Sequence, residues 1–211
     1  MMITIDDLVS EYQEAVRNRE WSKDFSELVD EVEGNEYGNK LNLKNQFLRK
    51  NEQSLGVTEI DKVITQVPSI LSYQVEINLK PSGEYLGSLG MKNVGAVVTK
   101  FPTILAMDVE NNLKPTMEYL VNECNVSIEK IESSPSLVSY SLNERIKPRH
   151  AFLQSRQIHV GCDVQIRGML APKDRIFAER VAKSDYGTWM SFKREYLKKV
   201  NSPNHLNTKT N

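Results

Sequence analysis

The sequence has 211 residues, of which 39% are hydrophobic and 26% are charged, enough apolar material for one domain with a substantial core or for a short array of smaller units. No apolar run approaches the roughly 20 residues that cross a bilayer, and Asp6 and Asp7 stand where a targeting peptide would carry basic residues. Composition therefore excludes a membrane-spanning protein, and no targeting peptide is recognisable. Cys124 and Cys162 fit neither a disulfide framework nor a zinc pattern.

The charge is distributed unevenly along the chain. Residues 1–36 hold 3 basic and 11 acidic side chains, residues 37–140 hold 10 and 11, and residues 141–211 hold 14 and 6, although the net charge is only −1. An acidic front and a basic rear favour an anionic partner at the basic end.

The first 40 residues are predicted to form an acidic helical extension. Apolar residues recur there at helical spacing and fit two amphipathic helices: Ile5, Leu8, Tyr12 and Val16, then Trp21, Phe25, Leu28 and Val32. The following segment, "LNLKNQFLRKNEQSLG" (41–56), matches the end of a unit that recurs further along the chain.

That unit occurs three times, as "PSILSYQVEINLKPSGEYL" from Pro68, "PTILAMDVENNLKPTMEYL" from Pro102 and "PSLVSYSLNERIKPRHAFL" from Pro135. The spacing is 34 and then 33 residues, and apolar positions align throughout. A period of this length indicates a helical solenoid or array. We expect full repeats near 55–88, 89–121 and 122–154, a degenerate repeat over 155–197 and a polar tail over 198–211.

Each repeat is predicted to contain a first helix, a short helical turn that opens at the first proline, and a longer helix. The first helix carries a buried stripe at i, i+3, i+4 and i+7, as Ile60, Val63, Ile64 and Val67, then Val94, Val97, Val98 and Phe101. Gln74, Asp108 and Ser141 precede the longer helix, where Asp and Ser are good N-caps and Gln is a poor one.

A second proline follows in every repeat, at Pro81, Pro115 and Pro148. Inside a helix it would kink or break the backbone, and equal bends in every unit would accumulate into a curved superhelix. Alternatively, the proline starts a fresh helix. Both interpretations remain open from the sequence.

The succession of Pro, Leu three residues on, Leu-Lys-Pro, aromatic-Leu and Leu-Gly resembles the mitochondrial transcription termination factor (mTERF) family over about residues 41–197. The resemblance implies an all-α, curved solenoid of stacked three-helix repeats of about 33 to 34 residues, whose concave basic groove binds double-stranded nucleic acid. It also implies a role in mitochondrial or chloroplast gene expression: transcription termination or initiation, splicing, or ribosome assembly with an RNA-modifying partner. Most members are not enzymes.

Lysine precedes the second proline in every repeat, and equivalent positions in a solenoid form a ladder on one face. These lysines either contact successive phosphates or lie beside an apolar stripe with their heads in solvent. The predicted nucleic-acid-binding residues are the ladder and the basic side chains of the last third: Lys80, Lys114, Lys147, Arg145, Arg149, Arg156, Arg167, Lys173, Arg175, Arg180, Lys193 and Arg194.

We expect no enzyme, cofactor or metal site, because the sequence has no phosphate loop, nucleophile elbow or paired-carboxylate motif. His159 with Cys162 is a lone pair of zinc candidates, and a plain loop is the commoner explanation. The leading hypothesis is a monomer that binds double-stranded DNA or structured RNA. The alternatives are a non-catalytic scaffold that has lost nucleic-acid affinity and uses its acidic N-terminus to bind a protein, and an accessory to a catalytic partner.

Overall fold

The computed structural model of the chain describes residues 55–67, 69–70 and 73–200. The predicted acidic helices of residues 1–40, most of the 41–56 segment and residues 201–211 of the predicted tail lie outside the described residues. The described residues are mostly helical and contain no strand, only an isolated bridge between Val160 and Val164. The all-α prediction is therefore confirmed for this part of the chain.

The same succession of elements occurs three times: a short α-helix, a 3-10 turn, a π-helical turn and a longer α-helix. In the first copy the 3-10 turn falls at residues whose description is incomplete. The elements are α4 (Ile60–Gln66), η2 (Val75–Leu79) and α5 (Lys80–Ser88); α6 (Val94–Lys100), η3 (Pro102–Ala106), η4 (Val109–Leu113) and α7 (Lys114–Asn122); α8 (Ile128–Ser133), η5 (Pro135–Ser139), η6 (Leu142–Ile146) and α9 (Lys147–Ser155).

The segment after α9 departs from this succession. It consists of α10 (Ile166–Leu170), α11 (Asp174–Ile176), η7 (Phe177–Val181) and α12 (Tyr186–Val200). The last helix is the longest of the described residues, with 15 residues. It continues through residues 198–200, which the sequence assigned to a polar tail.

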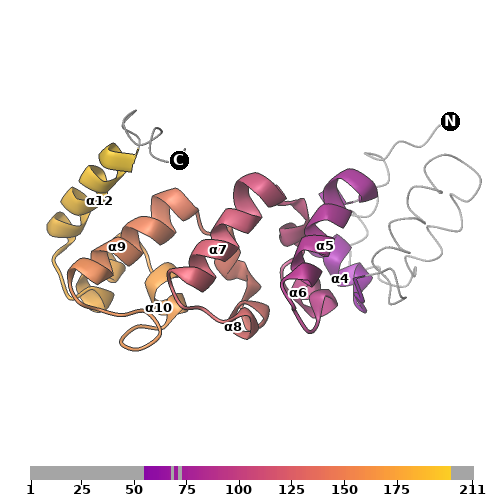
Figure 1. Cartoon of the computed structure of the whole chain (residues 1–211), viewed down its shortest axis with the longest axis horizontal. Helices are drawn as coiled ribbons and strands as arrows, with labels where there is room; N and C mark the ends of the chain where they lie inside the picture. The colour runs from indigo at the N-terminus through magenta and orange to yellow at the C-terminus, as the bar shows by residue number, and fades with distance from the viewer. Residues whose placement is uncertain (1–54, 68, 71–72, 201–211) are drawn as a thin grey trace, which may run out of the picture. The chain divides into compact units, whose positions relative to one another are not determined.

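The chain forms two compact units. Of the described residues, the first contains those between 55 and 113 and residues 132–135, and the second contains residues 114–131 and 136–200. Thus α4, α5 and α6 belong to the first unit, whereas α7, α9, α10, α11 and α12 belong to the second (Figure 1).

The first proline of the repeat opens a 3-10 turn, as predicted, at Pro102 and at Pro135. The missing N–H of proline costs nothing at the first position of a helical turn, because the turn has no acceptor for it there. Pro68, the equivalent residue in the first copy, lies outside the described residues.

The second proline is the second residue of the longer α-helix, at Pro81 in α5, Pro115 in α7 and Pro148 in α9, and this helix follows the π turn without a gap. The carbonyl of Gln74 accepts from the N–H groups of both Asn78 (2.9 Å) and Leu79 (3.4 Å), and the N–H of Lys80 reaches back five residues to Val75. The carbonyl of Ser141 accepts in the same way from Arg145 and Ile146, at 3.0 Å each. This wider π turn gives the following proline ring the room that a regular α-helix denies it, because the ring would meet the carbonyl four residues earlier.

The side chains before these turns behave as their capping preferences predict. The carboxylate of Asp108 accepts from the N–H of Asn111 at 2.7 Å, and the hydroxyl of Ser141 accepts from the N–H of Glu144 at 3.1 Å. The bond from the Asn111 backbone holds the pKa of Asp108 below its usual range. Gln74 makes no side-chain cap.

The apolar residues that align between copies are buried. Val63, Ile64, Val97 and Val98 of the predicted stripe are at most 1% exposed. The other four residues of the stripe, Ile60, Val67, Val94 and Phe101, are half-buried. The residues equivalent to one another at the end of the π turn (Leu79, Leu113, Ile146) and near the end of the longer helix (Leu86, Leu120, Leu153) are fully buried.

A close backbone approach in the first unit requires glycine at position 95. Gly95 lies at the start of α6, and a Cβ atom there would collide with the carbonyl of Gly56. The contact is with backbone, so no side-chain rotation can relieve it. Because Gly95 is also buried, the segment at residues 55–56 would have to move away.

We therefore expect Gly95→Ala to lower the free energy of unfolding by about 1 to 3 kcal/mol, the usual effect of overpacking, despite the better helix propensity of alanine. Thermal or urea unfolding followed by circular dichroism measures it. Gly87→Ala in α5 is the matched control, since a Cβ atom there meets nothing within 4 Å. Equal stability of Gly95→Ala and the parent would contradict the close approach.

Candidate nucleic-acid interface

The two units differ in charge. Among the described residues, the first unit carries 4 Lys and Arg against 7 Asp and Glu, whereas the second carries 15 against 9. The cations of the first unit are also more fully engaged: Lys62 pairs with Glu59 at 3.2 Å, Lys80 pairs with Glu76 at 2.9 Å, and Lys100 donates to the carbonyl of Glu132. Positive charge available to an anion is therefore concentrated in the second unit.

The repeated lysines start the longer helices, at the first residues of α5, α7 and α9. All three side chains are partly buried. The ammonium of Lys80 is held by Glu76, whereas that of Lys147 donates to the side-chain oxygen of Asn143 at 3.2 Å and lies 5.7 Å from the centre of the Tyr119 ring. The ladder remains a prediction, and its members differ in their surroundings.

Three predicted nucleic-acid-binding arginines turn toward the protein. Arg145 donates to the carbonyl of Pro172 at 2.9 Å, and Arg156 donates to the carbonyls of Ala182 (2.7 Å) and Lys183 (2.9 Å). Arg149 is 1% exposed and donates to the carbonyls of Met169 and Leu170. These carbonyls lie at the ends of α10 and η7, where helical turns leave acceptors without partners.

We call Arg145, Arg149 and Arg156 the arginine clasp, because together they tie α9 and η6 to the segment that follows. Their guanidinium groups satisfy main-chain carbonyls, so part of their hydrogen-bonding capacity is used within the protein, and their role in nucleic-acid binding remains a prediction. Arg149 is the most deeply buried of the three, because its side chain is only 1% exposed.

Asp174 links the clasp to α12. Its two carboxylate oxygens accept from Arg149 at 2.7 Å and from Lys193 at 3.1 Å. Burial works to raise the pKa of Asp174, but the bonds from Arg149 and Lys193 outweigh it and hold the pKa below the usual range. Burial lowers the pKa of Arg149 from its very high ordinary value, and Asp174 opposes this, so the arginine stays charged.

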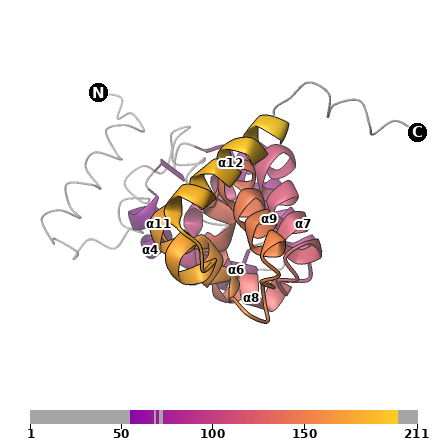
Figure 2. The ribbon, with the colours of Figure 1, turned by 90° about the vertical axis from the view of Figure 1, so that its left-hand side faces the viewer.

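Aromatic packing fixes α12 against α9. Trp189 is fully buried, with ring centroids 5.2 Å from Phe152 and 4.8 Å from Phe177. Figures 1 and 2 show α12 running along α9. One side of α12 is thus committed to the core, and its remaining side carries Arg194, Lys198 and Lys199, all exposed.

Other cations of the second unit face solvent. Arg175 pairs with Glu179 at 3.5 Å and lies over the Tyr186 ring, and Lys193 is held by Asp174. Among the described residues of this unit, the exposed basic side chains that form neither an ion pair nor a hydrogen bond with another described residue are Arg167, Lys173, Arg180, Lys183, Arg194 and Lys199. The sequence analysis did not include Lys183 among the nucleic-acid-binding residues.

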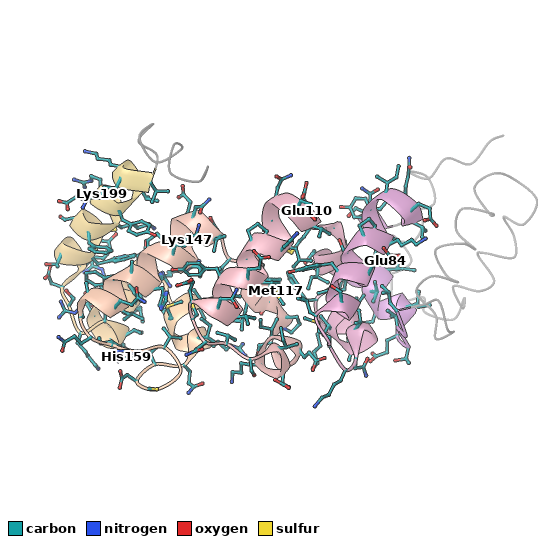
Figure 3. All side chains as sticks on the ribbon, viewed as in Figure 1. Glu84, Glu110, Met117, Lys147, His159 and Lys199 are labelled. Carbon is teal, nitrogen blue, oxygen red and sulfur yellow. The ribbon has the colours of Figure 1, made fainter. Side chains whose placement is uncertain are left out.

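Within the second unit, Lys147 and Lys199 lie toward the same side, and His159 lies toward the opposite side (Figure 3). We use the name basic edge for three cations of two helices: Lys147 at the start of α9, and Arg194 and Lys199, which are exposed on α12. Tyr119 lies under Lys147, and Trp189 and Phe192 of α12 pack against Phe152 of α9. The basic edge thus combines cations from two helices, α9 and α12.

The interior next to this edge holds a polar contact that the sequence did not predict. The hydroxyl of Tyr119 in α7 and Nδ1 of His150 in α9 are 3.1 Å apart. Burial raises the pKa of Tyr119 and lowers that of His150, so both are neutral at physiological pH. Burial also raises the pKa of the Cys124 thiol to about 12, which makes it an inert core residue.

His159 and Cys162, the zinc candidates, lie in an exposed loop, and Asp163 caps that loop by accepting from the N–H of His159 at 2.7 Å. Among the described residues no group of three or more His, Cys, Asp or Glu side chains could hold a metal ion.

The described part of the chain contains no helix with the length and hydrophobicity to cross a bilayer.

These features define a helical protein built from recurring units, with a basic surface at its C-terminal end. The family model of mTERF matches residues 34–178, so the chain belongs to the mTERF family. A comparison with curated proteins gave no match. Membership suggests an organellar, nucleic-acid-binding helical-repeat protein in a family whose members are generally not enzymes.

Proposed function

We propose that the protein binds double-stranded nucleic acid through the basic edge of its second unit and thereby regulates organellar gene expression, at transcription termination or initiation, splicing or ribosome assembly. In this proposal the repeats of about 33 to 34 residues stack as a curved solenoid, and the protein acts without catalysing a reaction. The observation that carries it is the contrast in available positive charge between the units. Cations of the first unit are mostly engaged by the protein, whereas the second unit presents six exposed basic side chains that form neither an ion pair nor a hydrogen bond with a described residue.

Phosphate contacts explain why such an arrangement favours nucleic acid. Each phosphate that a cation neutralises releases condensed counterions, and the released ions drive binding regardless of sequence. A lysine already paired with a carboxylate gains less, because the carboxylate must first be displaced. The second unit is therefore the proposed binding surface, and the first unit provides the sites for control substitutions.

The test is a salt titration of binding to random duplex DNA and to a structured RNA. We expect the triple variant Lys147→Gln, Arg194→Gln and Lys199→Gln to lower the slope of log affinity against log salt by roughly 2 to 3 for duplex DNA, at about 0.9 per lost contact. The matched control is Lys62→Gln, Lys92→Gln and Lys100→Gln in the first unit, which removes the same charge. Equal losses from both triples would show that total charge decides binding and would contradict the proposed surface.

The second candidate function is a non-catalytic scaffold without nucleic-acid affinity, whose acidic front binds a basic protein. The net charge of −8 in residues 1–36 and the acidic excess of the first unit favour it. It becomes the better explanation if the parent protein shows no salt-sensitive binding to either duplex DNA or structured RNA.

A further inference from the structure

The repeated lysines have different neighbours one helical turn away in each direction. Four residues before the lysine stand Glu76, Glu110 and Asn143 in the three copies, and four residues after it stand Glu84, Glu118 and Ala151. Residues four apart lie on the same face of a helix. At these two positions the first two copies place a carboxylate on each side of the lysine, and the third copy places none. Glu144 lies three residues before Lys147 but forms no ion pair with it in the described part of the chain.

In the first copy these carboxylates engage the lysine. Nζ of Lys80 lies 2.9 Å from a carboxylate oxygen of Glu76. The hydrogen bond from Glu76 is the largest cause that raises the pKa of Lys80, followed by the charge of Glu76, with the charge of Glu84 contributing in the same direction. A phosphate that approached Lys80 would have to displace Glu76 and would meet the repulsion of both acids.

In the third copy the lysine is oriented without being neutralised. Nζ of Lys147 donates to the side-chain oxygen of Asn143 at 3.2 Å and lies over the Tyr119 ring. Both partners are uncharged, so they hold the ammonium in place and leave its full charge for an anion. Pre-orientation also reduces the entropy that a flexible lysine loses when it binds.

We propose that the residue four positions before the repeated lysine determines whether that lysine is available to a phosphate. Glu76 pairs with Lys80 and makes it unavailable, whereas Asn143 orients Lys147 and leaves its charge available. Asn143 is thus a positioning residue, and the repeated lysine that binds nucleic acid is that of the third copy. This inference rests on the proposed nucleic-acid-binding function and narrows it. It expects Lys147, but not Lys80, to contact a phosphate.

The decisive variant is Asn143→Glu, which rebuilds in the third copy the pair found in the first. We expect it to lower the salt slope for duplex DNA by about 0.9, the loss of one phosphate contact, with a severalfold loss of affinity at low salt. Its helical content and melting temperature should not fall, since a glutamate near a helix N-terminus and four residues before a lysine is favourable.

Gln154→Glu is the matched control, because Gln154 is exposed on α9, the helix that Lys147 starts, and the change in charge is identical. A second control uses Lys147→Gln. If Asn143 acts through Lys147, then Asn143→Glu should have little further effect on the slope in the Lys147→Gln background, whereas Gln154→Glu should act equally in both backgrounds.

The outcomes separate this inference from the function on which it rests. A parent protein that binds, together with equal losses for Asn143→Glu and Gln154→Glu, overturns the positioning role alone. An undiminished effect of Asn143→Glu in the Lys147→Gln background also overturns it. A parent protein without salt-sensitive binding overturns both proposals.

Acylation of lysines followed by mass spectrometry adds a check that needs no nucleic acid. Asn143→Glu should slow the modification of Lys147, and Gln154→Glu should not.

Discussion

Replacing Arg149 by alanine should lower the free energy of unfolding by about 3 to 5 kcal/mol, the range found when one partner of a buried ion pair is removed. The guanidinium is 1% exposed and serves the carbonyls of Met169 and Leu170 as well as the carboxylate of Asp174. Without this guanidinium, the two carbonyls and the carboxylate lose the N–H groups that donate to them. Among the described side chains, Lys193 then remains as the hydrogen-bond donor to Asp174. Urea unfolding followed by circular dichroism and by Trp189 fluorescence measures the loss.

Arg167→Ala provides the control for Arg149→Ala. It removes one arginine from the same unit, but the Arg167 side chain is exposed and forms no ion pair with a described residue. We expect its stability to stay within about 0.5 kcal/mol of the parent, as for ordinary surface changes. If Arg149→Ala melted like the parent and lost only nucleic-acid binding, the guanidinium would be part of the interface, as the sequence first suggested.

Replacing Leu113 by alanine should cost about 2 to 5 kcal/mol, the usual effect of truncating a fully buried leucine. Leu113 is fully buried at the end of the π turn η4, at the position that Leu79 and Ile146 occupy in the other copies. Its N–H is bonded to the carbonyl of Asp108 at 2.8 Å, so the turn limits how far the backbone can close the cavity.

Asn112→Ala is the appropriate comparison for Leu113→Ala. Asn112 is the preceding residue of the same π turn and is exposed, so its replacement removes little buried surface. A thermal melt in which Leu113→Ala and Asn112→Ala coincide would show that Leu113 is not a core residue.

Much of the core could be predicted because burial leaves a periodic record in the sequence. Val63, Ile64, Val97 and Val98 recur at helical spacing, and all four are buried. The caps at Asp108 and Ser141 could be predicted for a related reason. A short side chain with an acceptor next to its own backbone satisfies a nearby N–H, so the outcome depends on a few neighbouring residues.

The backbone conformation around the second proline could not be predicted from neighbouring residues alone. The sequence offered a kink or a new helix, and the structure places the proline at the second residue of an α-helix that directly follows a π turn, with the carbonyl of Gln74 or Ser141 shared between two N–H groups. The choice among these depends on small differences in turn width, which are decided by how the buried residues on either side of the turn pack.

The sequence by itself determined that the chain is helical, that its units recur, where their core faces lie and that its positive charge gathers at the C-terminal end. Only the tertiary structure decided which of those charges are available. Arg149 and Arg194 are the same residue type in the same basic stretch, yet one is buried against carbonyls and Asp174 and the other is exposed. The reason is physical: hydrophobic periodicity is a property of neighbouring residues, whereas the partner of a long cation can be a carbonyl more than 20 residues away, which only packing brings within reach.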